Sequence, residues 1–207
     1  MLTLPVIFNK LFPHSLMKHL TTILLTLLFS MTAWAQSTEK LYDEGKELYD
    51  AKDYAKAFPK LKAAAEKGHK KAQYRLGRCY DKGRGVAKND KLAFQWYSKS
   101  AAQGYAKAQF QMGKCYKDGE GVEKDHAKAV SYFSKAAKQE HAEARYQLAK
   151  YYLKGKGGLS VDEKKAKTLL KQAVSDEKDG KEILEKIKAD VAEGDENAKK
   201  MLEMLKK

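Results

Sequence analysis

A repeat of 36 residues constrains the fold of this chain more than any other feature of its sequence. Ala72, Ala108 and Ala144 recur at this spacing. The same spacing relates "LGRCYDKGRGV" at 76–86 to "MGKCYKDGEGV" at 112–122. Self-similarity at one fixed period is typical of proteins in which short structural units stack in a row. We therefore expect a stacked-repeat architecture.

Each unit has the pattern of two helices joined by a glycine loop. Apolar or small residues fall at 72, 76, 79 and 80, which is one stripe of a helix. "DKGRGVAKND" interrupts this stripe, and a second helix is predicted from about 91 to 102. A single helical hairpin cannot bury its apolar faces, so the units must stack. The positions that define the hairpin in two successive units are Ala72, Gly77, Tyr80, Gly83 and Gly85, then Ala108, Gly113, Tyr116, Gly119 and Gly121.

The stretch "AQYRLGRCYDKGRGVAKNDKLAFQWYSKSAAQGYAKA" at 72–108 resembles a Sel1-like repeat, a relative of the tetratricopeptide repeat. The resemblance lies in the Leu-Gly-x-x-Tyr helix, the Gly-x-Gly-Val loop and the Trp-Tyr-x-Lys-x-Ala-Ala helix. It extends from Leu41 to about Val174 and implies an all-α, right-handed α/α solenoid of helix-turn-helix repeats. It also implies a module that binds other proteins.

The flanking units depart from this pattern, and the departures set the expected boundaries. Residues 40–71 form a first, tetratricopeptide-like repeat, because "YDAKDYAKAF" replaces the glycine loop. Two Sel1-like repeats follow at 72–107 and 108–143, and a degenerate one at 144–179. Residues 180–207 are expected to form capping helices, since the ends of a solenoid face water.

The first 35 residues have the pattern of a signal peptide. A short apolar run at 20–29 precedes Ala33-Trp34-Ala35, a small-x-small cleavage site, which predicts a cut between Ala35 and Gln36. Met17 is an alternative start. An uncleaved membrane anchor is the other interpretation of this segment. We expect export to a bacterial periplasm or outside the cell, and no integral membrane protein once the signal peptide is removed.

The chain is strongly basic, with 41 Lys and Arg against 27 Asp and Glu and a formal net charge of +14. This balance favours an acidic protein partner or an anionic envelope polymer over nucleic acid, given the predicted export. Much of the charge is also consistent with solvated helix faces, because the lysines are spread along the repeats.

No motif for bond chemistry is evident. The glycine loop lacks the strand and the GxxxxGK[ST] spacing of a phosphate loop, and the histidines lack a metal-ligand spacing. We therefore expect no enzymatic activity, no cofactor and no metal site. Cys79 and Cys115 lie on equivalent helices about 8–10 Å apart, too far for a disulfide, so we expect free core thiols. A strained or regulatory disulfide is the alternative.

One further pattern predicts a binding surface on the first helix of each unit. In solenoids of the Sel1-like family, which this sequence resembles, these helices line the concave face. An aromatic column and a basic column lie four residues apart on one helical face: Tyr42, Tyr74, Phe110 and Tyr146, beside Lys46, Arg78, Lys114 and Lys150. Aromatics and cations of this kind anchor and steer acidic or amphipathic protein segments. A structural aromatic stripe with a solvated lysine face is the alternative interpretation.

Two other functions remain open at this level. One is an envelope enzyme or small-ligand binder that acts on cell-wall-related substrates. The other is binding to anionic envelope polymers through net charge alone.

Overall fold

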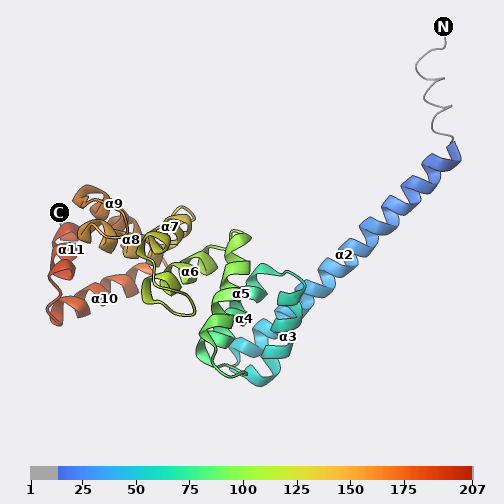
Figure 1. Cartoon of the computed structure of the whole chain (residues 1–207), viewed down its shortest axis with the longest axis horizontal. Helices are drawn as coiled ribbons and strands as arrows, with labels where there is room; N and C mark the ends of the chain where they lie inside the picture. The colour runs from blue at the N-terminus through green and yellow to red at the C-terminus, as the bar shows by residue number, and fades with distance from the viewer. Residues whose placement is uncertain (1–13, 207) are drawn as a thin grey trace, which may run out of the picture.

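The computed structural model describes residues 14–206, and every regular element within that range is an α-helix (Figure 1). In chain order the helices are α2 (His14–Asp50), α3 (Tyr54–Glu66), α4 (Lys70–Lys82), α5 (Asp90–Ala102), α6 (Ala106–Asp118), α7 (His126–Ala137), α8 (Ala142–Lys154), α9 (Glu163–Val174), α10 (Gly180–Ala192) and α11 (Glu196–Lys206).

Neighbouring helices pack in pairs, and the pairs stack in sequence. The pairs α2–α3, α4–α5, α6–α7 and α8–α9 are in close contact, and each pair also touches the next one. The helices α10 and α11 close the C-terminal end, where α10 contacts both α8 and α9. The expected all-α solenoid of stacked hairpins is confirmed.

The N-terminal part of α2 projects away from the stacked hairpins, whereas its C-terminal part packs against α3 (Figure 1). The predicted signal peptide falls partly on residues 1–13, which lie outside the described residues. Among the described residues, no helix has both the length and the apolarity that crossing a membrane requires.

Helix ends are specified locally in every Sel1-like unit. The second helices begin after Asn89, Asp125 and Asp162, whose side chains each accept a hydrogen bond from a backbone N–H in the first turn. This arrangement satisfies an N–H group that the helix itself leaves unpaired. The first helices end where Gly83 and Gly119 adopt the left-handed conformation, which glycine enters without steric cost.

Two other glycines allow close packing between helices. A Cβ atom on Gly77 would lie 2.6 Å from the Tyr97 ring, and one on Gly113 would lie 2.5 Å from the Phe133 ring. Both distances are far below van der Waals contact. The repeated glycine therefore lets the first helix of each hairpin rest directly on an aromatic ring of the second helix.

The Gly-x-Gly loop is a joint between units. A Cβ atom on Gly85 would collide with the backbone carbonyl oxygen of Tyr54 at the start of α3, and one on Gly121 with that of Asp90 at the start of α5. The loop thus packs its backbone against the preceding second helix. This close contact accounts for the repeated glycine without a bound phosphate.

The hydrophobic core is segmented along the solenoid. Cys79 belongs to the cluster around α2, α3 and α4, whereas Cys115 belongs to the cluster around α5 and α6. Both thiols are buried and free. Burial raises the pKa of Cys79 to about 11 and the pKa of Cys115 to about 12. Both thiols therefore stay protonated near neutral pH, which makes them poor nucleophiles.

Candidate functional site: a basic groove

A groove lies between α6, α8 and α10, with residues of α8 between those of the two flanking helices. It consists of two hollows of about 330 and 510 Å³. The hollows share Lys117, Gln147 and Lys186, so they form one continuous depression. We call the smaller one the lysine pocket and the larger one the mixed hollow.

The two hollows differ in charge. Five lysines and one carboxylate line the lysine pocket, which gives a formal net charge of +4 with its histidine neutral. Three lysines face four carboxylates in the mixed hollow, which gives a formal net charge of −1, and its apolar lining residues, Phe110 and Ile183, are buried. The lysine pocket is lined by Lys117, His126, Gln147, Lys150, Tyr151, Lys154, Lys156, Lys186 and Asp190. The mixed hollow is lined by Phe110, Lys114, Lys117, Asp118, Glu143, Gln147, Asp179, Glu182, Ile183 and Lys186.

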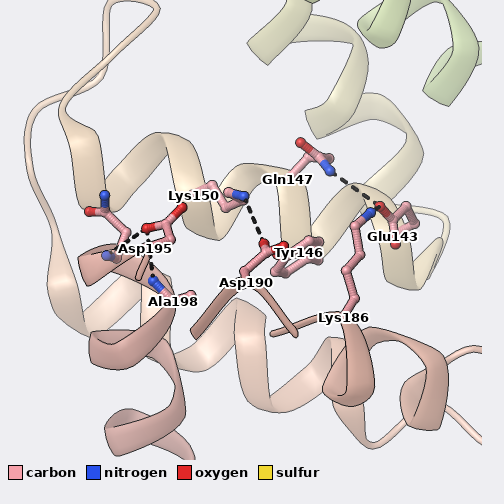
Figure 2. Close-up of polar contacts among 9 residues, drawn as sticks. Glu143, Tyr146, Gln147, Lys150, Lys186, Asp190, Asp195 and Ala198 are labelled. Carbon is pink, nitrogen blue, oxygen red and sulfur yellow. Dashed lines mark hydrogen bonds and ion pairs between the residues drawn. The ribbon is translucent and has the colours of Figure 1, made fainter. Parts of the chain in front are cut away.

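The wall formed by α10 is tied to α8 by polar contacts (Figure 2). The Asp190 carboxylate lies 3.5 Å from the Lys150 ammonium and accepts a hydrogen bond of 3.3 Å from the Tyr146 hydroxyl. Farther along the same interface, the Lys186 ammonium lies 3.0 Å from the Glu143 carboxylate. Beneath these contacts, Ile183 and Ile187 of α10 share a core cluster with Tyr146.

His126, Gln147 and Tyr151 supply the neutral polar groups of the lysine pocket. The Nδ1 atom of His126 lies 2.9 Å from the Tyr151 hydroxyl oxygen. Burial lowers the pKa of His126, and the positive charges of Lys156 and Lys124 lower it further. The imidazole is therefore neutral at pH 7, and it senses the positive potential of the surrounding lysines.

The predicted aromatic column is covered mainly by the chain itself. Tyr42, Phe110 and Tyr146 are buried, and Tyr74 is partly buried. The ring of each of the first three members packs against the turn residue that begins the next unit. The ring centroids are 4.3 Å apart for Tyr42 and His69, 5.3 Å for Tyr74 and Tyr105, and 4.7 Å for Phe110 and His141.

The last aromatic has a different neighbour. In place of the histidine or tyrosine, the position 36 residues after His141 carries Glu177. The Tyr146 ring is instead covered by α10, and the Lys186 ammonium lies 5.5 Å from the ring centroid. The aromatic column thus has a packing role along the solenoid, and its role in partner binding stays a prediction.

The predicted basic column divides into two halves. Lys114 and Lys150 line the groove. Lys46 lies 3.4 Å from the Asp50 carboxylate, and the Arg78 guanidinium lies over the Tyr49 ring at 5.6 Å. The structure therefore gathers the two C-terminal members of the column, and not the two N-terminal ones, into one depression.

Other groove residues were not anticipated from the sequence. Lys117 and Lys154 lie three and four residues after Lys114 and Lys150, so helical spacing alone contained the signal for both. Lys186 lies beyond the point where the repeat register is lost, and no sequence pattern placed α10 against α8. In the described part of the chain, no group of three or more His, Cys, Asp or Glu side chains is arranged to hold a metal ion.

Hairpins joined by glycine loops and stacked in register define an α/α repeat scaffold. The model of the Sel1 repeat matches this chain three times, at residues 70–105, 106–141 and 142–176, and the chain belongs to the Sel1 repeat family. Each match begins two residues before the unit boundary expected from the alanines. Proteins of this family are protein-interaction scaffolds, in general without catalytic activity.

Two solved structures illustrate the relationship. A Sel1 repeat protein from Oxalobacter formigenes is 39% identical, with a TM-score of 0.62, over 65% of this chain and 53% of that one. The protective antigen c5321 of uropathogenic Escherichia coli, which displays an SLR fold, is 23% identical with a TM-score of 0.57, over 82% of this chain and 49% of that one. The chain thus spans about half the length of each. No functionally curated protein matches it.

Proposed function

We propose that this chain is an exported interaction module of the bacterial cell envelope, which binds an acidic or amphipathic protein segment in the groove between α6, α8 and α10. The observation that carries the proposal is the groove itself, in which lysines from three helices converge around one depression. Recognition would involve no bond chemistry.

The groove is positive at the lysine pocket, with a formal net charge of +4, and slightly negative at the mixed hollow, with −1. The lysine pocket therefore attracts an acidic segment, and the mixture of charges in the other hollow orients it. Lys114 and Lys117 project from α6 into the mixed hollow, and Lys117 also reaches the lysine pocket. Such cations accelerate the encounter with an acidic segment and disfavour basic ones. Because the groove is open to water, added salt weakens this attraction.

Apolar contact in the mixed hollow is limited. Phe110 and Ile183 line it beside Lys114, but they are only 9% and 1% exposed, and Ile183 belongs to the core cluster of Tyr146. The aliphatic stems of the groove lysines therefore supply the apolar contact that an amphipathic segment would make. The charges select the partner.

The envelope location rests on the N-terminal sequence and the net charge. The apolar run at 20–29 and the Ala-Trp-Ala site carry the export proposal. Expression of the full chain in a Gram-negative host, fractionation and N-terminal sequencing test it. We expect a periplasmic protein that begins at Gln36, and a cytoplasmic protein with an intact N-terminus would contradict this.

A matched pair of variants tests the interaction. In one, Lys114→Glu and Lys117→Glu reverse two charges of the groove. In the other, Lys91→Glu and Lys164→Glu reverse two exposed lysines in the first turns of α5 and α9, outside the groove. Envelope proteins captured by the wild type should be retained by the control variant and lost by the groove variant. Equal capture by all three would contradict the proposal.

A further inference from the structure

The lysine pocket carries more positive charge than its own carboxylate balances. Asp190 is its single acidic residue, and that carboxylate is already engaged by Lys150 and Tyr146. Two other pocket lysines are paired with carboxylates outside the pocket lining: Lys117 lies 3.4 Å from Asp118 and Lys186 lies 3.0 Å from Glu143. Among the described residues, the remaining two, Lys154 and Lys156, have no carboxylate within ion-pair distance, although both line the pocket. The ammonium groups of Lys154 and Lys156 lack counter-charges and repel each other, so a bound anion would stabilise this part of the pocket.

The interior of the pocket experiences this positive potential. Lys156 and Lys124 both act on His126 to lower its pKa, in addition to the effect of burial. The same imidazole faces the Tyr151 hydroxyl, while Asp125 and Asp118 exert a weaker opposing influence. The neutral form is therefore maintained by the surrounding cations as well as by burial.

Asp190 is the one anionic group among the described residues that line the pocket. Its carboxylate accepts a hydrogen bond from the Tyr146 hydroxyl and lies 3.5 Å from the Lys150 ammonium. The side chains of Lys150 and Asp190 are both less than one-third exposed. An anion elsewhere in the pocket would meet Lys154 and Lys156, and also Lys117, whose ammonium lies 3.4 Å from the Asp118 carboxylate. Ammonium groups act as point-charge donors toward phosphate oxygens.

We propose that the lysine pocket binds a compact, multiply charged oxyanion of the phosphate class. A group with a charge of about −2 matches the two unpaired lysines, Lys154 and Lys156, better than a single carboxylate does. The cavity of about 330 Å³ also leaves room for a substituent on the phosphate. This site lies within the groove proposed above and shares Lys117 and Lys186 with the mixed hollow, but binding of the oxyanion does not require the protein segment.

Titration with inorganic phosphate tests the site directly. The wild type, a pocket variant with Lys154→Gln and Lys156→Gln, and a control with Lys91→Gln and Lys164→Gln are compared by calorimetry in chloride buffer. We expect the pocket variant to bind phosphate about tenfold more weakly, and the control to match the wild type. No binding, or equal affinity in all three proteins, would overturn the proposal.

A second readout locates the anion. NMR titration of the histidine side chains follows His126 inside the pocket and His141 outside it. Phosphate should raise the pKa of His126 because an anion offsets the field of the nearby lysines, and it should leave His141 unchanged. Equal shifts at both histidines, or none, would show that phosphate binds elsewhere and would overturn the proposal.

Two further ligands distinguish the source of the phosphate. Glycerol 3-phosphate represents a phosphate on a small molecule, and vesicles of phosphatidylglycerol represent a lipid headgroup. If Lys154→Gln and Lys156→Gln weaken the binding of glycerol 3-phosphate but not that of the vesicles, the ligand is a soluble phosphate compound. If they weaken only the binding of the vesicles, the ligand is a lipid headgroup. The segment-binding proposal is tested separately in phosphate-free buffer with Lys114→Glu alone, because Lys114 lines only the mixed hollow, so either proposal can fail alone.

Discussion

The hydroxyl of Tyr146 donates a hydrogen bond to the carboxylate of Asp190, which joins the last Sel1 repeat to the C-terminal helix α10. Lys150 reinforces the contact from the same helix as Tyr146 (Figure 2). This hydrogen bond holds α10, which forms one wall of the groove, against α8. The integrity of the groove therefore depends on a helix that lies beyond the matched repeats.

Removal of the carboxylate should weaken the attachment of α10. Asp190→Ala leaves the Tyr146 hydroxyl and the Lys150 ammonium without their acceptor, and we expect a loss of about 1–2 kcal/mol in the free energy of unfolding. Asp190→Asn keeps an acceptor and should cost less. Urea denaturation measures the loss, and hydrogen exchange should show the added opening in residues 180–192. Unchanged protection there would contradict this role.

Filling the space at a repeated glycine should destabilise the hairpin. A Cβ atom at Gly113 would overlap the Phe133 ring, so Gly113→Ala is expected to cost about 1–3 kcal/mol. This cost would appear even though alanine is the better helix former. Thermal or urea denaturation provides the measurement. Combining Gly113→Ala with Phe133→Leu should recover part of the loss, and strictly additive effects would argue against the clash.

The stability should fall as the pH drops below neutrality. The Nδ1 atom of His141 accepts a hydrogen bond from the Ala144 N–H, and burial lowers the pKa of this histidine from the ordinary value of 6.5. The folded state thus favours the neutral ring. The stabilisation is present above pH 6.5 and is lost as the pH falls through the lowered pKa. His141→Asn, a neutral capping residue, should flatten this dependence in urea midpoints measured between pH 7.5 and 5. An unchanged slope would contradict the assignment.

The two thiols should resist modification in the folded protein. Burial keeps Cys79 and Cys115 protonated, with pKa values of about 11 and about 12, so labelling with a disulfide reagent at pH 8 should proceed only as fast as local opening. Unfolding in urea should expose both to rapid labelling. Fast reaction in the native state, or a disulfide under non-reducing conditions, would contradict the free buried state.

The 36-residue repeat is sufficient to predict the solenoid and the structural role of its repeated glycines. Gly77 and Gly113 occupy equivalent positions because each rests on a ring of the partner helix, and such packing recurs with the repeat. Alignment of the repeats at a fixed period shows which positions have the same structural environment. It does not reveal what covers a given face, as Phe110 shows: its ring stacks on His141 of the next unit.

The groove could be predicted only in part, for a related reason. Lys114 and Lys150 were recognised from the register, whereas Lys186 belongs to a helix that no longer follows it. The position of α10 depends on burial of Ile183 and Ile187 against the last repeat, which is a tertiary contact. Local sequence patterns specify helices well, but a contact between segments far apart in the chain requires the folded structure.

We propose above all that the groove between α6, α8 and α10 binds an acidic protein segment. The most direct measurement is the affinity of a captured envelope partner for the wild type, for the Lys114→Glu and Lys117→Glu variant, and for the Lys91→Glu and Lys164→Glu control at low ionic strength. We expect binding at least about tenfold weaker in the groove variant and unchanged in the control. Equal affinity for all three proteins, with folding intact, would contradict the account.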